Sequence, residues 1–526
     1  MLRKFLPKGF LRKFSTGVIV VGGGVLAYDG YANQFLYTGA SVRFLRSCKV
    51  ALAISKDYYL ALHKGDKGDT EDFLKEVHLK SANRILEACL NNGGLYIKIG
   101  QGVSAINHIL PMEYTKTLSK LHDKCLPSSK ENIQKVFLKD FGDVPENIFE
   151  EFDYKPVAAA SLAQVFKGKL KSGEQVAVKV QYNNLDKRFP SDVGTLIFLQ
   201  NVIEVFFKNY NFGWILKDLR ANLEKELDFC NEGANAERCW KDLSRFKNVY
   251  VPKIFWSYTK KRVLTMEWID GFKITDIASL KKNNIDLKYL DKKLFHIFSE
   301  QIFNSGFVHA DPHAGNLFIR SKKPGDFDLV ILDHGLYEYL PEKFRKSLCQ
   351  FWEAAVLRDE NTMSHSAKEL NIKYYKNFAE VLFQTPYENK GANIKTKLTD
   401  EDIKYMQEIA KNNFDKIMET LKEMPRNMLF VVRNLNTIRA ISREHGDPID
   451  RPRIMARYAQ KCLWNRYSLF GFFKWVCRRA KFEFQIMKDN LKLAVHLLYL
   501  DTLHMLGRST KNSKEILQIG EKYRQV

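Results

Sequence analysis

Four short polar motifs in a fixed order constrain the fold of this chain more than any other feature of its sequence. Lys179 lies in V-A-V-K-V, an alternating run that predicts a strand. Glu226 lies in E-K-E-L-D-F, an acidic stretch of helical character. Asp311 and Asn316 share the loop H-A-D-P-H-A-G-N, and Asp333 follows an apolar run in V-I-L-D-H-G. Each motif alone is ordinary, but together and in this order they predict one composite site.

The same order of residue types serves phosphoryl transfer in protein kinases. ATP concentrates negative charge on its triphosphate, so such a site needs a fixed cation and Mg²⁺ held by carboxylate and amide oxygens. We expect Lys179 to clamp the phosphates, with Glu226 orienting its ammonium group. Asn316 and Asp333 would ligate Mg²⁺. Asp311 would lie near the attacking hydroxyl as its base.

His309 and His313 lie four residues apart in the same loop and have an alternative interpretation as metal ligands. Pro312 stands between them and would break the helix needed to align the two rings. The histidine metal site is therefore disfavoured.

The sequence departs from an ordinary protein kinase in three places. An alanine-rich segment, 157–165, stands where a glycine-rich phosphate loop would precede Lys179, and its Cβ atoms exclude backbone conformations that glycine adopts. The interval between Lys179 and Glu226 holds an insertion at roughly 183–215. Leu340-Pro341-Glu342 begins seven residues after Asp333, which leaves almost no activation segment. A peptide substrate would therefore lack its usual docking platform.

Seven motifs over roughly residues 90–340 resemble those of the UbiB family of atypical kinases, the aarF-domain-containing kinases. They are K-I-G-Q (Lys98–Gln101), L-P-x-E-Y (Leu110–Tyr114), A-A-A-S (Ala158–Ser161), V-A-V-K-V-Q (Val176–Gln181), E-L-D-F-x-x-E (Glu226–Glu232), A-D-P-H-A-G-N (Ala310–Asn316) and L-D-H-G (Leu332–Gly335). The resemblance implies an α+β, protein-kinase-like bilobal fold with a helical N-terminal extension and a helical C-terminal region. It also implies an atypical phosphotransferase or ATPase that uses ATP (or ADP) and Mg²⁺ and is linked to mitochondrial lipid or ubiquinone homeostasis.

The resemblance also assigns residues to roles. Residues expected to contact the nucleotide are Val157, Ala158, Ala159, Ala160, Ser161, Val165, Lys179 and Glu226. Family-specific gating residues are expected to be Lys98, Gln101, Asp228 and Glu232. In that scheme Lys98 reaches the acidic segment at Glu226 and Asp228 and occludes the cleft used by peptide substrates. Ala310 replaces the arginine of H-R-D, so activation by phosphorylation through that arginine is not expected. His334 replaces the phenylalanine of D-F-G, so the packing that sets active and inactive states is expected to differ.

The sequence pattern divides the chain into four segments. Residues 1–30 are predicted to be a targeting segment, and 31–150 the helical extension that carries K-I-G-Q. Residues 151–345 form the kinase-like core, with an N-lobe at about 151–268 and a C-lobe from about 269. Residues 346–526 complete the C-lobe and form a helical C-terminal extension. Short Val-rich or apolar runs predict strands at 157–170, 175–180, 251–254, 263–268, 317–319 and 329–332.

The amino terminus predicts a mitochondrial location, in the matrix or at the inner membrane. Five basic residues and no acid precede Asp29, and apolar residues alternate with the charges, as in a transit peptide. A secretory signal is the rival, but eight scattered cysteines without a C-x-x-C pair favour a compartment poor in disulfides. A membrane anchor is the weaker alternative, because the uncharged run 14–28 is shorter than the roughly 20 residues of a spanning helix.

The formal charge of +22 is compatible with nucleic acid, an anionic membrane or a basic compartment. Because Lys and Arg alternate with acids and form no nucleic-acid-binding signature, no nucleic-acid partner is expected. The expected partners are a nucleotide, an anionic membrane lipid or lipid-like substrate, and mitochondrial proteins. Residues 464–484 mix aromatic and basic side chains, which favours a core helix with a basic rim over a helix lying on an anionic membrane.

Three functional hypotheses follow from the sequence. The first is a mitochondrial kinase or ATPase with a small or lipid-like acceptor. The second is a nucleotide-binding scaffold that regulates mitochondrial partners without phosphoryl transfer. The presence of every polar catalytic residue argues against the scaffold, whereas the alanine-rich segment and the cover expected from Lys98 favour it. The third, a basic nucleic-acid or membrane adaptor that merely keeps a kinase fold, is the least favoured of the three.

Overall fold

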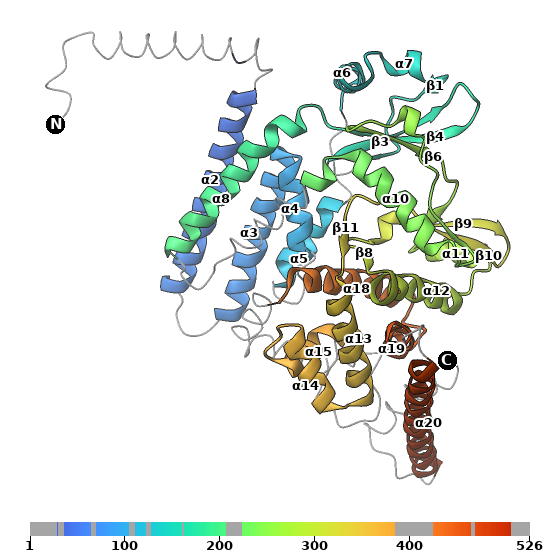
Figure 1. Cartoon of the computed structure of the whole chain (residues 1–526). Helices are drawn as coiled ribbons and strands as arrows, with labels where there is room; N and C mark the ends of the chain where they lie inside the picture. The colour runs from blue at the N-terminus through green and yellow to red at the C-terminus, as the bar shows by residue number, and fades with distance from the viewer. Residues whose placement is uncertain are drawn as a thin grey trace, which may run out of the picture. The chain divides into compact units, whose positions relative to one another are not determined.

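The computed structural model describes residues 29, 36–64, 70–104, 111–122, 128–159, 162–206, 224–383, 424–463 and 469–505 (Figure 1). They fall into two compact units, each described by itself below. Unit 1 comprises Met1–Cys230 and Ile254–Trp268, and unit 2 comprises Asn231–Lys253 and Ile269–Val526. Of the predicted targeting segment, residues 1–30, only Asp29 is described, and the uncharged run 14–28 lies outside the described residues.

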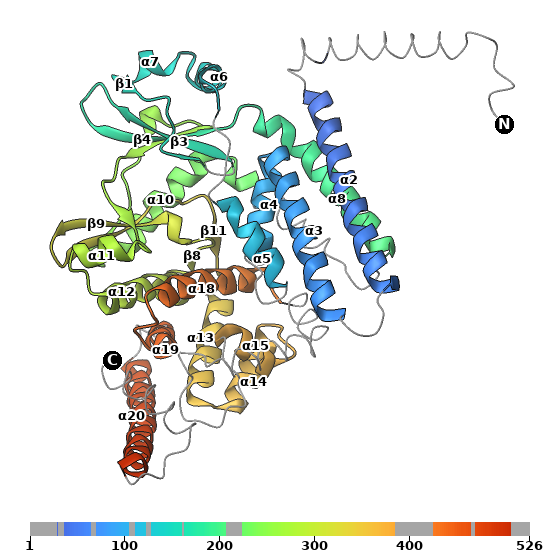
Figure 2. The ribbon, with the colours of Figure 1, turned by 180° about the vertical axis from the view of Figure 1, so that it is seen from behind.

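Unit 1 begins with long helices. They are α2 (Leu36–Lys64), α3 (Thr70–Asn92), α4 (Leu95–Ser104), α5 (Met112–Leu118), the 3₁₀ turn η2 (Ser119–His122) and α8 (Leu185–Phe206). Helix α8 lies within the predicted insertion and runs beside α2 (Figure 2), where Arg43 Nε and Asp192 Oδ1 form a buried ion pair at 2.7 Å. Gly93 and Gly94 have φ of 69° and 51°, which lets the chain turn between α3 and α4.

The sheet of unit 1 has the order β1-β3-β4-β6, with β2 added beside β3. Its strands are β1 (Glu151–Phe152), β2 (Ala158–Ala159), β3 (Ala163–Lys169), β4 (Gln175–Gln181) and β6 (Val263–Glu267). Strands β3 and β4 coincide with parts of the strands predicted at 157–170 and 175–180. They pair antiparallel as a hairpin, and Gly173 takes φ of 97° in the turn. One face of the sheet packs on α6 (Lys130–Phe141), which is followed by α7 (Pro145–Ile148), and buries Phe137, Phe166 and Val178.

The sheets of unit 2 are small. The first has the order β5-β10-β9-β7, formed by β5 (Val249–Tyr250), β10 (Asp326–Ile331), β9 (Leu317–Lys323) and β7 (Phe272–Lys273). The second pairs β8 (Phe307–His309) with β11 (Tyr337–Tyr339). Strands predicted at 317–319 and 329–332 are confirmed as parts of β9 and β10. The strand predicted at 251–254 is wrong: the pairing residues are 249–250, and Ile254 makes only an isolated bridge.

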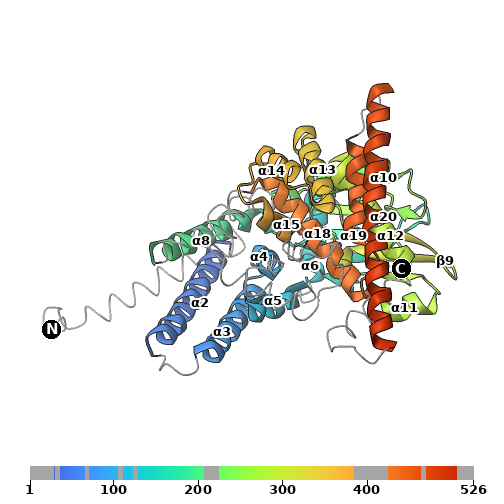
Figure 3. The same cartoon turned by 90° about the horizontal axis from the view of Figure 1, so that it is seen from below.

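Helices form the rest of unit 2, most of α10 among them. They are α10 (Phe229–Leu243), α11 (Ile277–Lys282), α12 (Leu287–Ser299) continued by the π-helical turn η4 (Glu300–Ser305), α13 (Glu342–Leu357), α14 (Glu360–Glu369), α15 (Tyr375–Phe383), α18 (Arg426–Glu444), α19 (Arg451–Cys462) and α20 (Leu469–Met505). Figure 3 shows α20 beside α19, where Arg457 forms an ion pair with Glu483 at 2.9 Å. Phe482 of α20 is buried but Phe473 and Phe484 are exposed, so the core interpretation of this region holds for one face of the helix. Among the described helices, none combines the length and apolar character needed to cross a membrane.

Candidate functional site

Lys179 projects from the central strand of the unit 1 sheet. The strand register places Val165 and Leu264 directly beside it, on β3 and β6, so these three side chains share one face. Val178 and Val180 point to the other face and are buried. The Lys179 ammonium lies 5.2 Å from the centroid of the Phe229 ring. Alternation in V-A-V-K-V therefore fixes the direction of Lys179 through the burial of its neighbours.

Glu226 meets Lys98 in the structure. The two side chains form an ion pair with Lys98 Nζ 2.8 Å from Glu226 Oε2, and the Glu226 side chain is only 9% exposed. The backbone of the same segment is held by Gln181, whose Nε2 donates to Leu227 O at 2.8 Å. Gln181 is buried and ends β4, so the strand that carries Lys179 also positions the acidic segment. The role of Gln181 is visible only in the structure, although it stands in the V-A-V-K-V-Q motif.

The K-I-G-Q segment lies in the middle of α4. Gln101 Nε2 donates to Leu121 O at 3.0 Å, which ties α4 to η2. A Cβ at Gly100 would overlap with Leu121 Cδ1, so the absence of a side chain permits this close packing. Asp228 accepts a hydrogen bond from Cys230 N at the start of α10, and Glu232 of unit 2 is buried in the first turn of that helix.

The alanine-rich segment is a short strand that leads into the hairpin. Ala158 pairs with Val165 and Ala159 with Gln164, and Val157 N donates to Val165 O at 2.9 Å. Val157 and Ala158 are exposed, and Ala159 is half-buried. Ala160 and Ser161, at the tip of the segment, lie outside the described residues.

In unit 2 the strand register assembles the remaining motif residues. β9 and β10 pair antiparallel with Leu317 opposite Ile331, and Leu332 N donates to Asn316 O at 2.9 Å. Asn316 and Asp333 therefore leave the same end of the hairpin on neighbouring strands. Asn316 also contacts the start of its own loop, with its Nδ2 3.5 Å from Asp311 O.

His309 joins the two loops that carry the acidic residues. Its Nδ1 accepts from Asp311 N at 3.0 Å, and its Nε2 lies 2.8 Å from Asp333 O. Burial lowers the pKa of His309 to about 4, although the negative charges of Asp333 and Asp311 act to raise it. The ring is therefore neutral at neutral pH. A neutral ring that accepts at Nδ1 carries its proton on Nε2, and it donates that proton to the Asp333 carbonyl. The histidine thus fixes both backbones and is no metal ligand in this geometry.

Helix α18 supplies further contacts to the loop that carries Asp311. Arg433 Nη2 donates to Asp311 Oδ2 at 2.8 Å, and the next residue, Asn434, donates from Nδ2 to His309 O at 2.6 Å. The Asp311 side chain is 21% exposed and its arginine partner 29%. A partly buried, charge-assisted hydrogen bond of this kind orients a carboxylate. The sequence carries no local signal for Arg433, which is 122 residues from Asp311.

The D-H-G segment is held in one conformation by His334. Its Nε2 lies 3.0 Å from Ile331 O and its Nδ1 3.0 Å from Tyr337 Oη. The His334 and Tyr337 rings are nearly parallel, at an interplanar angle of 7°. Gly335 N donates to Asp333 Oδ1 at 2.9 Å, and Asn235 of α10 donates to His334 O. The Asp333 carboxylate is therefore placed by its neighbours on both sides.

The oxygen donors of unit 2 fit Mg²⁺ better than a transition metal. The described residues contain no group of three or more His, Cys, Asp and Glu side chains able to hold a metal ion. Asn316 and Asp333 would provide an amide and a carboxylate oxygen, and Mg²⁺ commonly takes one or two protein ligands with water and substrate phosphates completing its shell.

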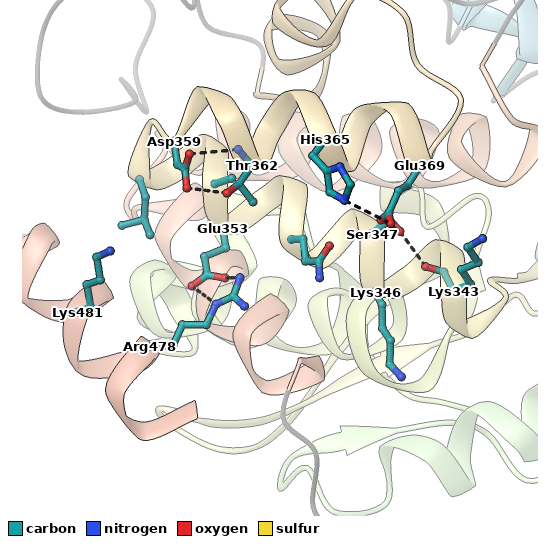
Figure 4. Close-up of a pocket in the computed structure, with 13 residues that line it drawn as sticks. Lys343, Lys346, Ser347, Glu353, Asp359, Thr362, His365, Glu369, Arg478 and Lys481 are labelled. Carbon is teal, nitrogen blue, oxygen red and sulfur yellow. Dashed lines mark hydrogen bonds and ion pairs between the residues drawn. The ribbon is translucent and has the colours of Figure 1, made fainter. Parts of the chain in front are cut away.

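A separate cavity of about 570 Å³ opens in unit 2 between α13, α14 and α20 (Figure 4). Glu353 of α13 accepts from Arg478 Nε of α20 at 2.8 Å on its wall. Lys346 and Glu369 also line it, so its charges are mixed, and it contains none of the motif residues. The pairing of Glu353 with Arg478 serves to hold α20 against α13.

Comparison with known proteins identifies the family. The family model of the ABC1 atypical kinase-like domain matches residues 120–367. The AarF domain-containing protein kinase 1 of Gallus gallus is 35% identical over 419 residues, which cover 78% of this chain and 80% of that protein. The chain belongs to this ABC1, or AarF-domain, family of atypical kinases. The resemblance seen in the sequence motifs is confirmed, and so is the α+β kinase-like fold class.

Other AarF-domain proteins align over similar lengths. The AarF domain-containing kinase 1 of Drosophila melanogaster is 34% identical, with 82% of this chain and 85% of that protein covered. The probable serine/threonine-protein kinase abkD of Dictyostelium discoideum is 39% identical over 440 residues, and this chain spans 63% of its length. A solved Rv3197–erythromycin complex from Mycobacterium tuberculosis aligns at 20% identity with a TM-score of 0.42, over 71% of this chain and 97% of that one. At that score the family assignment rests on sequence alone.

Proposed function

We propose that this AarF-domain protein is an ATP-dependent, Mg²⁺-requiring phosphotransferase or ATPase. The observation that supports it most directly is the bridge made by His309, which holds the backbones of Asp311 and Asp333 in one rigid arrangement. Chemistry that depends on positioning and electrostatics needs such preorganised groups. Family membership supplies the second support, since the relatives carry kinase names.

The roles follow from the positions of the side chains within each unit. Asp311 would orient and deprotonate the acceptor hydroxyl, with Arg433 keeping the carboxylate aimed. Asn316 and Asp333 would hold Mg²⁺, which neutralises charge on the phosphates when bound. In unit 1, Lys179 would bind the nucleotide phosphates. Val157, Ala158 and Ala159, with Ala160 and Ser161, would cover the nucleotide through a segment paired to β3.

The acceptor is proposed to be a small or lipid-like molecule instead of a peptide. In unit 2, β11 begins at Tyr337 and returns at once to pair with β8, and α13 begins at Glu342. The chain between Asp333 and α13 is thus used in pairing and leaves little length for a peptide-binding segment. A role in mitochondrial lipid or ubiquinone homeostasis is proposed from the family resemblance and from the basic, acid-free amino terminus.

A second candidate is a nucleotide-binding scaffold without phosphoryl transfer. The ion pair between Lys98 and Glu226 favours it, because Glu226 is the residue expected to orient Lys179. A glutamate held by Lys98 is drawn away from that task unless the pair opens during turnover. Both candidates bind the nucleotide, but only the enzyme releases or transfers its phosphate.

The test measures Mg²⁺-dependent ATP and ADP binding and phosphate release by the purified full chain, with and without anionic lipid vesicles. Wild type is compared with Asp333→Asn and with Asp270→Asn, a matched control at an exposed position outside the motifs. Binding with turnover that is lost only in Asp333→Asn supports the enzyme. Binding without turnover in every condition supports the scaffold. Failure of wild type to bind nucleotide contradicts both.

A further inference from the structure

Helix α20 is held against unit 2 only along its first half. Phe482 and Ile486 are buried, and Arg478 forms an ion pair with Glu353 of α13. Beyond Ile486, each α20 side chain that the structure describes is exposed, as far as the last helical residue, Met505. Most helices in proteins are stabilised by tertiary packing of an apolar face. The second half of α20 has no such packing among the described residues, so its exposed face calls for a partner.

That exposed face carries an apolar stripe with a seven-residue repeat, which we call the α20 seam. Its first set of positions is Cys477, Phe484, Leu491, Leu498 and Met505, and its second set is Phe473, Ala480, Met487 and Ala494. All nine side chains are exposed, and the six large ones are 60–86% exposed. The same repeat in the sequence meets one polar residue, Asp501. Spacings of three and four residues in alternation, sustained over four repeats from Cys477 to Met505, are typical of a coiled-coil helix.

The sizes of the seam residues fit a second α20 that runs in the opposite direction. Antiparallel pairing sets the first set of positions against the second set of the other helix. With the two-fold axis midway between Met487 and Leu491, the facing pairs are Phe484 with Ala494, Leu498 with Ala480, Leu491 with Met487, and Met505 with Phe473. Both alanines then face a large side chain, which fills the layer evenly. A parallel pair would instead set each alanine against its own copy and leave two thin layers beside a crowded Phe484 layer.

We propose that the α20 seam joins two copies of this chain in an antiparallel, two-fold coiled coil. Such a contact uses the same surface on both copies and closes as a dimer. At roughly 100 Å² for each large seam residue, two copies bury on the order of 1,200 Å² of apolar surface. That area reaches the lower limit for a stable interface. The buried residues Phe482 and Ile486 lie on the opposite side of the helix from the seam, so the attachment of α20 to unit 2 leaves the seam accessible.

An anionic membrane is the other occupant that the exposed face could accept, since Lys481 and Lys488 stand beside the seam. A lipid surface, however, gives no reason for large and small residues to face one another in register. The two occupants also differ in their response to salt. Lys488 lies next to the two-fold axis of the dimer and close to its own copy, so added salt should not weaken the dimer. Salt would weaken the attraction of the same lysines to anionic lipid.

The first test measures the monomer–dimer equilibrium of the reduced, full-length chain by analytical ultracentrifugation at low and high salt. Leu498→Gln is compared with Tyr499→Gln, its neighbour on α20, which is exposed to nearly the same extent but lies outside the seam. Both side chains are exposed, so neither change disturbs the core of unit 2. Wild type and Tyr499→Gln are expected to form the dimer equally well. Leu498→Gln should raise the dissociation constant about ten-fold or more, because the substitution removes an apolar side chain from the interface twice.

The second test determines the direction of the two helices by disulfide cross-linking in a Cys477→Ser background. Met487→Cys chains and Leu491→Cys chains are oxidised separately and as a mixture, and are then digested without reductant for peptide mass spectrometry. Antiparallel pairing is expected to link the two variants to each other in the mixture. A parallel pair would instead link each variant to itself, and wild type through Cys477.

Several results overturn the proposal. A wild-type chain that stays monomeric at every concentration excludes the dimer. Equal dissociation constants for Leu498→Gln and Tyr499→Gln, or a dimer that salt dissociates, place the interface elsewhere. Links of each variant to itself, or no link in the mixture while the dimer persists, contradict the antiparallel register. A monomer that sediments with vesicles of phosphatidylcholine and phosphatidylserine, and releases them in Leu498→Gln, assigns the seam to a membrane instead.

Discussion

The close packing of α4 predicts opposite effects for the same substitution at two glycines of one helix. At Gly100 a Cβ would overlap with Leu121 Cδ1 and would lie 3.3 Å from Cys89 Sγ. Leu121 is fully buried, so its side chain has little room to withdraw. At Gly102, two residues along α4, a Cβ would have no atom of another element within 4 Å.

The magnitudes follow from these contacts. Alanine in place of glycine inside a helix stabilises it by about 0.5–1 kcal/mol, and this gain is common to both sites. Overpacking a closed core costs about 1–3 kcal/mol, and only Gly100→Ala incurs that cost. We therefore expect Gly102→Ala to be slightly more stable than wild type. Gly100→Ala should be less stable than Gly102→Ala by about 1–3 kcal/mol in the free energy of unfolding.

Thermal unfolding of the purified chain measures the difference. In a unit of 150–250 residues, about 1 kcal/mol shifts the unfolding midpoint by roughly 2–4 °C. A double-mutant cycle adds a second check, because Leu121→Ala removes the atom that the new Cβ would meet. Its cost should be smaller in the Gly100→Ala background than in wild type. Equal midpoints for Gly100→Ala and Gly102→Ala would falsify the account of K-I-G-Q as a packing motif.

Three other perturbations have defined outcomes. Arg433→Gln removes the charge-assisted hydrogen bond to Asp311, which is worth about 1.5–3 kcal/mol, so kcat should fall roughly ten- to hundred-fold with KM little changed. Arg433→Lys should restore part of the lost kcat. An unchanged kcat in Arg433→Gln would refute the role of Arg433 in orienting Asp311. Ala159→Gly should alter ATP and ADP affinity in titration calorimetry, and identical affinities would contradict a nucleotide contact by that segment. His445 is buried, which opposes its charge, but its bond to Asp291 prevails and raises its pKa above 6.5. The stabilisation from protonated His445 is present below pH 6.5 and is lost as pH rises through the folded pKa. Between pH 6 and 9 the unfolding midpoint should therefore fall less steeply in His445→Gln than in wild type.

Local sequence patterns predicted the elements around the site because they determine which faces are buried. The alternation around Lys179 and the turn at Gly173 specify the β3–β4 hairpin without reference to the rest of the chain. The apolar runs on either side of residues 323–326 likewise specify β9 and β10, whose register then brings Asn316 next to Leu332.

The same reasoning failed where buried residues do not pair with a neighbouring strand. Val251 and Ile254 are buried, as a strand residue would be, but Pro252 between them has no N–H to donate to a ladder. The pairing with β10 therefore ends at Tyr250.

Contacts that depend on tertiary structure left no local trace. Arg433 is 122 residues from Asp311 in the sequence, and no local sequence pattern predicts the contact between them. The kinase pattern predicted Glu226 to be the partner of Lys179, and only the family resemblance implied Lys98 as its partner. In the structure Glu226 forms an ion pair with Lys98 at 2.8 Å. Gly100 was quoted as part of a motif, but its steric role emerges only once Leu121 is placed against it.

The two hydrogen bonds and the stacked ring that hold His334 bear on the choice of inhibitors. Many compounds aimed at protein kinases exploit mobility of the aromatic residue in D-F-G, whose packing distinguishes active from inactive states. Here an equivalent rotation would break the bonds from His334 to Ile331 and Tyr337 and leave buried polar atoms without partners. Chemical probes for this protein are better sought among compounds that leave D-H-G as it stands, and selectivity against ordinary kinases follows from the same histidine.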